Sequence, residues 1–246
     1  MTGTHGAAAS DRGAGARLLM IEAAERLFAE RGINGVSLRE IGAQAGQRNT
    51  AAARYHFGSK EALVDAVFRH RMEPINARRL AMLAELDAAG HGHDARGLVE
   101  AFLYPLAATL GEVGKPGWYL RFCVHAAFLE GTAVRDLARE EWTRGVYTVR
   151  ERMLGLLAEL PARVRDERWM LMSSYLTHAL ADREMTLHFP GRHTPTDREV
   201  FLAGLTDTAV ALYLAPVSAR TEAAIDRSRR PVPPAAAPGP SQEVRP

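Results

Sequence analysis

The sequence predicts an all-α protein, and three observations support this prediction. Apolar residues recur at helical spacing along almost the whole chain, and no convincing alternating strand is flanked by hairpin dipeptides. The breaks between helical stretches fall at Gly and Pro clusters, for instance at 114–117 (GKPG). With 47% hydrophobic and 24% charged residues, the chain of 246 residues is apolar enough to bury a core.

The composition also narrows the class of protein. No apolar stretch approaches the roughly 18 to 20 residues of a membrane-spanning helix, and the start of the chain lacks the apolar run of a secretory signal, so we expect a cytoplasmic protein. A single cysteine, Cys123, excludes an internal disulfide and a cysteine-based metal site, and we expect neither a metal nor a cofactor. The formal charge of +2 is too small for nonspecific coating of nucleic acid, so any nucleic-acid contact must be local.

Three short helices are expected near the N-terminus, after a disordered Gly- and Ala-rich tail over residues 1–15. The first covers 16–31 and ends before Gly32, which suits a left-handed cap. Its spacing predicts one apolar stripe. The stripe consists of Leu18, Ile21, Ala24, Leu27 and Phe28.

The next two helices are joined by a turn that contains glycine. The second helix begins at Ser37, whose hydroxyl and the Glu40 side chain form a predicted capping box, and it ends at Gly46. The third starts at residue 49 or 50 and ends at 56 or 57.

Longer helices follow, and their expected ranges are 60–89, 95–113, 117–130, 133–160, 162–186 and 197–215. The fourth of these carries apolar residues at alternating steps of three and four, typical of a helix packed lengthwise against others. These residues are Trp142, Val146, Val149, Met153, Leu156 and Leu160. Since prolines crowd the end of the chain, 217–246 is expected to be a disordered tail. The chain thus divides into a helix-turn-helix domain at 16–62 and a larger helical domain at 63–216.

A helix, a Gly-containing turn and a short helix can place the second helix in the major groove of DNA. From Arg39 to Lys60 the chain has four basic residues and one acid, a local net charge of +3. Three small residues, 51–53, would let the helix backbone approach the groove. The alternative is an ordinary solvated basic helix face. Donors suited to base edges or phosphates are Arg48, Asn49, Thr50, Arg54, Tyr55 and His56.

The segment from Ala23 to Leu63, with the runs AAERLFAERG, SLREIGAQAG and RYHFGSKEAL, resembles the DNA-binding domain of the TetR family of transcriptional regulators. Several separated elements agree in order and spacing, and the resemblance covers about a quarter of the chain. These elements are Phe28 and Gly32, then Ile41 with Ala45-Gly46, then Tyr55-His56-Phe57 and Ser59-Lys60.

The resemblance implies phosphate contacts by Tyr55, His56 and Lys60, and Ser37 is similarly placed at the start of the second helix. Two departures from the family pattern stand in the turn: one additional residue between 46 and 57, and Gln47 where an apolar residue is usual. The register of the reading helix is therefore open by one residue. On side-chain chemistry alone, the candidate base readers are Arg48, Asn49, Thr50 and Arg54.

One short reading helix gives little specificity, so we expect a homodimer that reads a palindrome with half-sites about 34 to 36 Å apart. The helices at 162–186 and 197–215 are apolar over more than one stripe, and the family resemblance implies that the last long helices form a four-helix dimer interface. A purely internal core is the alternative. The apolar residues concerned are Trp169, Met172, Tyr175, Leu176, Ala179, Leu180, Phe201, Leu202, Leu205, Ala209, Leu212 and Tyr213.

The middle helices contain aromatic residues and one imidazole that resemble the lining of a small-molecule site, although core packing explains such spacing as well. The family resemblance implies an effector between these helices, of unidentified chemistry. The candidate effector-binding residues are Tyr104, Trp118, Phe122, His125, Phe128 and Trp142.

The function we expect is a repressor released from a palindromic operator by a small-molecule effector, with the long helix from Lys60 as the lever between the two halves. An activator or a ligand-independent regulator is the first alternative, and a helical ligand-binding enzyme is the second. The run 91–94 (HGHD) reads as a surface turn, and Cys123 and His125 point about 200° apart on a helix, so neither set forms a metal site.

Overall fold

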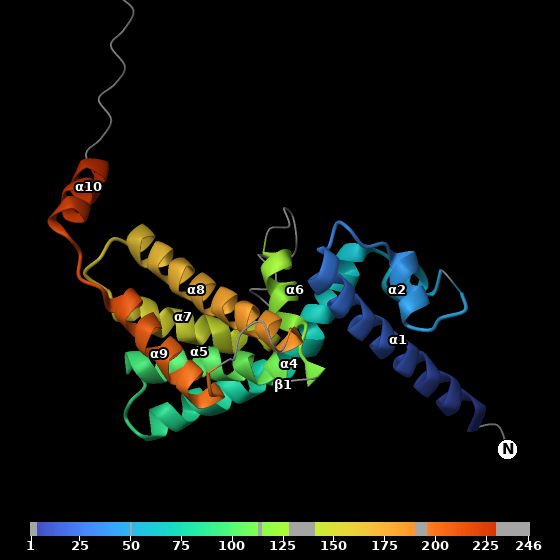
Figure 1. Ribbon diagram of the computed structural model, residues 1–246. Coiled ribbons are helices and arrows are strands. Elements are labelled where there is room, and N and C mark those ends of the chain that lie inside the picture. The colour runs from blue at the N-terminus through green and yellow to red at the C-terminus, as the bar shows by residue number, and fades with distance from the viewer. Residues whose placement is uncertain (1–3, 50, 113–114, 128–140, 190–195, 230–246) are drawn as a thin grey trace, which may run out of the picture. The chain divides into compact units, whose positions relative to one another are not determined.

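The computed structural model describes residues 4–49, 51–112, 115–127, 141–189 and 196–229. It confirms the all-α prediction (Figure 1). No single helix in these ranges is long and apolar enough to cross a membrane. The helices are α1 (Thr4–Arg31), α2 (Leu38–Gln44), α3 (Ala52–Phe57), α4 (Lys60–Ala88), α5 (Ala95–Ala107), α6 (Tyr119–Ala126), α7 (Arg144–Gly155), α8 (Ala162–His188), α9 (Arg198–Leu214) and α10 (Ala219–Arg229), with short 3-10 turns η1 (Ala108–Leu110) and η3 (Glu141–Thr143).

Helices α1 to α3 form the predicted helix-turn-helix. The buried face of α1 includes Ile21, Leu27 and Phe28, which pack with Ile41 of α2 in one continuous core. Gly46 ends the α2 segment at φ +69°, a left-handed conformation that a side chain disfavours. The turn that sets the angle between α2 and α3 therefore depends on this glycine.

Two expectations for the first helix were wrong. Helix α1 begins at Thr4, although residues 1–15 were expected to be a tail. Alanine has the highest intrinsic helix propensity, and a helix already formed by packing extends at little cost, so an Ala-rich segment can continue it. Leu18 is 40% exposed, whereas Met20 takes its place on the buried stripe.

The larger helical part surrounds α4, which packs on α1, α5 and α7. Helices α8 and α9 lie side by side, and α9 also packs on α5 (Figure 1). The predicted seam of α7 is confirmed at its centre, where Val149 and Met153 are fully buried. The helix ends at Gly155 and not near 160. Residues 128–140, which include part of the expected helix 133–160, lie outside the described ranges.

The expected helix 95–113 is also shorter in the structure. Helix α5 ends at Ala107, and after η1 two residues on each side pair as antiparallel strands β1 (Gly111–Glu112) and β2 (Lys115–Pro116). Gly111 adopts φ +71°, and a Cβ there would lie 2.4 Å from the Lys115 carbonyl oxygen. The glycine thus permits a tight reversal that no hydrophobic pattern announced.

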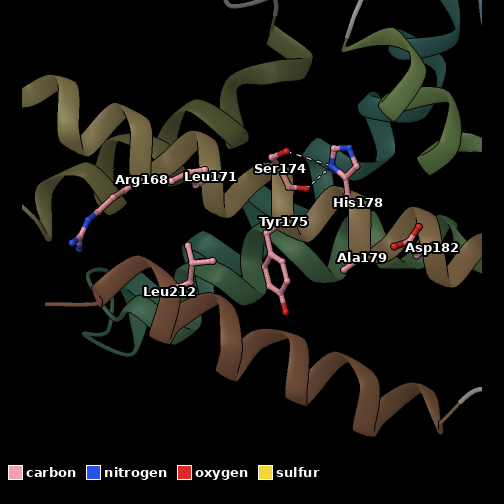
Figure 2. A pocket seen from close by; sticks show the side chains of 8 residues that line it. All are labelled: Arg168, Leu171, Ser174, Tyr175, His178, Ala179, Asp182 and Leu212. Atoms are coloured by element: carbon pink, nitrogen blue, oxygen red, sulfur yellow. Dashed lines mark hydrogen bonds between the residues drawn. The ribbon is translucent and has the colours of Figure 1, made fainter. Parts of the chain in front are cut away.

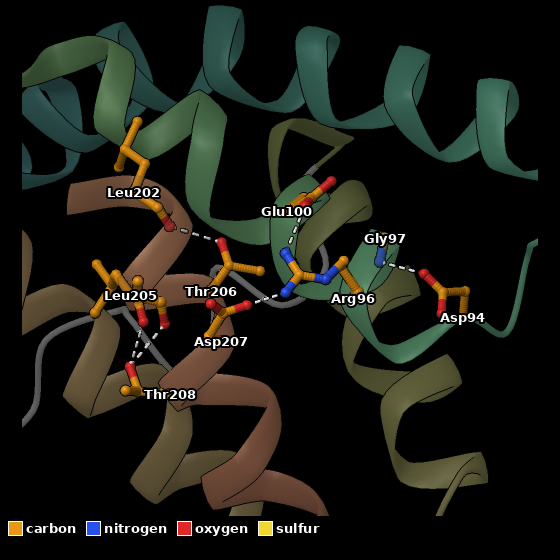
Figure 3. Close-up of polar contacts among 10 residues, drawn as sticks. Asp94, Arg96, Gly97, Glu100, Leu202, Leu205, Thr206, Asp207 and Thr208 are labelled. Carbon is orange, nitrogen blue, oxygen red and sulfur yellow. Dashed lines mark hydrogen bonds and ion pairs between the residues drawn. The ribbon is translucent and has the colours of Figure 1, made fainter. Parts of the chain in front are cut away.

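Polar contacts orient α9 on α5 (Figure 3). Arg96 of α5 is paired with Asp207 of α9 and lies 3.5 Å from Glu100 in its own helix. Asp94 caps α5 by accepting a hydrogen bond from the Gly97 N–H at 2.7 Å. With Asp207 held by α5, the buried face of α9 is the one carrying Leu205.

Residues 215–246 form a separate unit in which α10 is helical. The sequence led us to expect a tail over 217–246, and Ala219–Arg229 corrects that expectation within the described residues. Its sequence lacks the prolines that crowd 231–246, so nothing prevents helical hydrogen bonding there.

A buried ion pair joins α1 to α4. Glu25 is 2% exposed and accepts two hydrogen bonds from Arg71, at 2.6 Å from Nε and 2.8 Å from Nη2. The pairing raises the pKa of Arg71. Such a bidentate pair fixes both distance and rotation between two helices, and here the helices are the first of the helix-turn-helix and the long connection to the rest.

Arg71→Met should destabilise the protein more than Glu25→Met does. Without Arg71 the Glu25 carboxylate is buried and unpaired, which costs about 3 to 5 kcal/mol. Without Glu25 the Arg71 side chain, already 37% exposed, turns into water. The free energy of unfolding from urea denaturation tests this order.

Arg78→Met is the matched control, since Arg78 and its partner Glu85 are 58% and 65% exposed and such a pair contributes at most about 1 kcal/mol. Equal losses for the two variants of the buried pair would contradict the expectation.

Candidate nucleic-acid interface and ligand-binding regions

Helix α3 turns one face outward and one into the core. Ala53 is fully buried, whereas Arg54 is exposed and Tyr55 is 85% exposed, the highest value among the large apolar residues described. A guanidinium and a phenol on one exposed surface are suited to base edges and phosphates. Of the three alanines expected to face the groove, Ala53 is therefore misassigned, because its methyl group packs inward.

The turn before α3 exposes two more predicted contact residues, Arg48 and Asn49. The Asn49 Oδ1 accepts a hydrogen bond from the Ala51 N–H at 2.9 Å, and its carbonyl accepts one from the Ala52 N–H at 3.0 Å. Asn49 thus closes the turn through its oxygen and keeps its side-chain amide N–H groups outward. Helix α3 begins at Ala52, two or three residues later than expected; Thr50 lies outside the described residues.

The predicted capping box at α2 is confirmed. The Ser37 Oγ accepts from the Glu40 N–H at 3.3 Å, and the Ser37 N–H donates to the Glu40 carboxylate at 2.8 Å. Hydrogen bonds from Ser37, followed by the charge of Arg31, lower the pKa of Glu40. Ser37 is exposed, so its role in the protein itself is to fix where α2 starts.

The remaining predicted phosphate contacts lie around the start of α4. His56 is half-buried and meets Tyr55 edge-on, with ring centroids 5.3 Å apart. The Lys60 Nζ donates to the Ile33 carbonyl at 3.1 Å, which ties α4 to the loop before α2. This bond uses one of three ammonium donors, and the other two remain for a phosphate.

Helix α6 connects the helix-turn-helix to the rest of the protein. It packs against both α1 and α8. Phe122, fully buried, lies between Phe28 of α1 and Phe68 of α4, with ring centroids 6.1 Å and 4.8 Å away. Aromatic side chains of α1, α4 and α6 therefore meet at one place. We call this contact, together with the Glu25–Arg71 pair, the joint.

Helix α6 is also held by a carboxylate from α8. Glu184, fully buried, accepts from the Leu120 N–H at 3.3 Å and the Arg121 N–H at 3.0 Å, which are free donors at the start of α6. Burial raises the pKa of Glu184, and the two backbone donors and Arg121 oppose that rise. Glu184 thus caps a helix to which it does not belong, and it couples α8 to α6.

The candidate effector residues have different surroundings in the structure. Phe122 belongs to the joint, Tyr104 is 37% exposed on α5, and His125 is exposed near Gly32 of α1. Periodicity identified their common apolar character but not their neighbours, and Phe128 lies outside the described residues.

The two tryptophans of that set have distinct environments. The Trp118 ring contacts the His188 ring at a tilt of 51°, with ring centroids 3.9 Å apart, and Trp118 lines a pocket of about 490 Å³ between α1, the end of α2 and α4. Trp142 is 8% exposed, and its indole Nε1 has no hydrogen-bond partner among the residues that the structure describes. A buried donor without a partner is costly, which makes Trp142 the member of the set most in need of a ligand.

An open groove of about 670 Å³ runs between α8 and α9 (Figure 2). Half of the apolar residues expected at a dimer interface are buried in the protomer's own core, among them Met172, Leu176 and Leu205. A second stripe of α8 stays outside it. The groove is lined by Arg168, Leu171, Ser174, Tyr175, His178, Ala179, Asp182 and Leu212.

Three charged residues within the described ranges, Glu25, Glu184 and Arg79, are buried although the sequence pattern did not predict it. All three lie within helices whose polar positions were read as solvated. Pro105, inside an otherwise apolar helical run, was the one available signal for Arg79, because a proline leaves a carbonyl of the preceding turn without its usual donor.

Comparison with known proteins agrees with the helix-turn-helix. Residues 20–67 match the family model for "Bacterial regulatory proteins, tetR family". Among curated proteins, none is similar enough to this chain to count as a match.

Two solved structures are similar at low identity. One is RolR in complex with resorcinol, with 19% identity, coverage of 91% of this chain and 98% of that one, and a TM-score of 0.44. The other is a putative TetR-family transcriptional regulator from Mesorhizobium loti MAFF303099, with 17% identity, coverage of 83% and 97%, and a TM-score of 0.40.

The matched segment spans the buried face of α1, the capped α2, the outward face of α3 and the start of α4. The match therefore identifies residues 20–67 as similar to the DNA-binding domain of TetR-family regulators, which supports a role as a DNA-binding transcriptional regulator.

Proposed function

We propose that the protein is a repressor that binds a palindromic operator as a homodimer and is released by a small-molecule effector. The observation that carries the DNA-binding part is the outward face of α3, where Arg54 and Tyr55 stand exposed beside Arg48 and Asn49 of the turn. The proposed base readers are Arg48, Asn49, Thr50 and Arg54, and the proposed phosphate contacts are Ser37, Tyr55, His56 and Lys60.

The groove of α8 supports the proposal of a homodimer. Its stripe runs through residues 168, 171, 175, 178 and 182, at steps of three, four, three and four, which lie on one side of a helix. Arg168 and Asp182, at its ends, are each seven residues from Tyr175. Two antiparallel copies of α8 that cross at Tyr175 therefore bring each Arg168 to the other copy's Asp182.

This register has further support in the surroundings of both charges. Asp182 is exposed and has no hydrogen bond or ion pair from its carboxylate within the described residues. Arg168 donates one bond, from Nη1 to the Tyr213 carbonyl at 3.0 Å, and has other donors left. Self-complementary charges at equal distances from a two-fold axis are what an isologous interface requires.

The joint supports the proposed release. An effector that shifts α4 or α6 also shifts α1, since Arg71 of α4 holds Glu25 and Phe122 of α6 packs on Phe28. A tenfold to hundredfold loss of operator affinity needs a coupling of about 1.4 to 2.8 kcal/mol. One buried ion pair and one aromatic contact can supply energies of that size.

Arg54→Ala and Lys60→Ala should weaken DNA binding in different ways. Arg54→Ala should remove about 1 to 3 kcal/mol of preference at one base pair, whereas Lys60→Ala should weaken all sequences equally and reduce the salt slope by about one. Footprinting of DNA upstream of the gene and its divergent neighbour supplies the operator, and titrations of base-pair variants at several salt concentrations supply the measurement.

Arg78→Ala, an exposed arginine on α4, is the control and should leave binding unchanged. Because Lys60 also bonds the Ile33 carbonyl, the free energy of unfolding of its variant is measured alongside. If neither Arg54→Ala nor Lys60→Ala altered operator binding, the contact assignment would be wrong.

Arg168→Asp and Asp182→Arg should each raise the dimer dissociation constant, by roughly tenfold to a hundredfold, because each single change brings two like-charged pairs together across the axis. The double variant Arg168→Asp/Asp182→Arg restores opposite charges and should regain most of the affinity. Sedimentation equilibrium measures all three, with Glu151→Arg on α7 as the charge-reversal control.

A Tyr175→Cys variant tests the register separately, since a residue on the axis should form a disulfide with its own copy. The native Cys123 should not interfere, because burial raises the pKa of its thiol. A monomeric wild type would refute the dimer; a dimer without this cross-link would refute only the crossing point.

A further inference from the structure

Arg79 of α4 is the largest fully buried side chain, with 0% exposure. It points between α5 and the start of α7. Gly145 of α7 lies directly against it, because a Cβ at that position would be 3.1 Å from the Arg79 Cδ. The guanidinium is thus enclosed where three helices of the larger part of the protein meet.

Two of its nitrogens bond the backbone of α5. Nε donates to the Ala101 carbonyl at 3.2 Å and Nη2 to the Phe102 carbonyl at 3.1 Å. Pro105 has no N–H, so the Ala101 carbonyl lacks its helical donor, and Arg79 replaces it. This explains two hydrogen bonds but leaves the positive charge without a counter-ion.

Two other arginines, Arg71 and Arg121, differ from Arg79 because each has a carboxylate nearby. Arg71 faces Glu25, and Arg121 lies 3.5 Å from Glu184, whereas within the described residues no carboxylate pairs with Arg79. Carbonyl dipoles and the Phe102 ring, 5.3 Å from the guanidinium carbon, offset part of the desolvation. Burial lowers the pKa of Arg79 to about 10, so the group stays charged at neutral pH.

The surroundings also have more donors than acceptors. Nη1 of Arg79 and Nε1 of Trp142 are buried, and neither has a hydrogen-bond partner within the described residues. The nearby acceptors are occupied: the Asn76 Oδ1 accepts from the Gly145 N–H at 2.6 Å, and the Glu141 carbonyl accepts from the Asn76 Nδ2 at 3.2 Å. Where α4 meets residues 141–145, the part of the chain that the structure describes therefore leaves a cation and two N–H groups without an anionic acceptor.

We infer that Arg79 anchors a binding site for a small organic carboxylate, with the Trp142 indole N–H as a second donor. Phe102 and the buried Tyr119, which interacts electrostatically with Arg79, supply aromatic surroundings that favour an apolar or aromatic body on the carboxylate. The inference rests on the proposed effector-dependent repression and names the chemical class of that effector.

The location also explains how such a ligand would act. Gly145 lies so close to α4 that a Cβ there would be 2.7 Å from the Asn76 Oδ1, so we expect a bound carboxylate to push residues 141–145 away from α4. Helix α4 begins at Lys60 in the helix-turn-helix and carries Arg71, the partner of Glu25. Moving residues 141–145 away from Arg79 would therefore act on α4, the helix that holds α1.

The test compares carboxylates with their neutral amides on the full-length protein. Butyrate, benzoate and phenylacetate are each titrated beside the corresponding amide by calorimetry and thermal unfolding. At least one carboxylate should bind with saturation and on the order of 10-fold to 100-fold more tightly than its amide. If none of the three is preferred over its amide by the wild type, the inference is overturned.

Two variants locate the site. Arg79→Met should abolish the preference for the carboxylate, while Arg78→Met, its exposed neighbour, should retain it. Trp142→Phe keeps an aromatic ring, removes only the N–H, and should weaken the carboxylate several-fold, so the site stays testable if Arg79→Met does not fold. Wild-type binding by Trp142→Phe together with a folded, fully binding Arg79→Met would place the carboxylate elsewhere and refute the site.

Operator titrations with and without the bound carboxylate separate the two proposals. Carboxylate binding at Arg79 with unchanged operator affinity leaves the site standing and refutes effector-dependent release. Intact operator binding with no carboxylate preference refutes only the site.

Discussion

The position of the helix-turn-helix depends on the buried joint that α1, α4 and α6 form. A charged contact and an aromatic contact act there together: Arg71 of α4 forms an ion pair with Glu25 of α1, and Phe122 of α6 lies against Phe28 of α1. The ion pair is directional and the rings fill space, so the first fixes rotation while the second fixes separation. Both contacts therefore help to fix the orientation of α1, and with it that of α3, relative to the larger helical part.

Local patterns in the sequence predicted local structure well. The capping box of Ser37 and Glu40, the glycine turn at Gly46 and the long helix from Lys60 each depend on residues within a few positions of one another. The exposed face of α3 was predicted in part, since Arg54 and Tyr55 are outward but Ala53 is not. A six-residue helix offers too few positions to define its buried side by periodicity.

Long-range partners could not be predicted in the same way. The aromatic residues of the middle helices were correctly recognised as apolar, but their partners were not predicted: Phe122 packs on α1, and Trp118 packs on His188. Spacing identifies an apolar stripe on a helix and not the surface that the stripe contacts. Glu25, Glu184 and Arg79 were overlooked for the same reason. A charged residue in an amphipathic helix is ordinarily solvated, and only the distant partner, an arginine, a helix start or a freed carbonyl, shows why it is buried.

Helix α8 connects the proposed dimer axis to the DNA-binding part. Tyr175 lies in the open groove, and Glu184, nine residues later on the same helix, caps α6. A helix is stiff over this length, about 14 Å, so the distance from the axis to α6 is set by backbone geometry. From α6 the aromatic contact continues to α1, and α1 packs on α2 and α3. In a dimer, the distance between the two copies of α3 would then be set by α8, by the bonds of Glu184 to α6 and by the contact of Phe122 with Phe28. Helix α1 is also held by α4, through the pair of Arg71 with Glu25, so moving residues 141–145 away from α4 would act on this second connection.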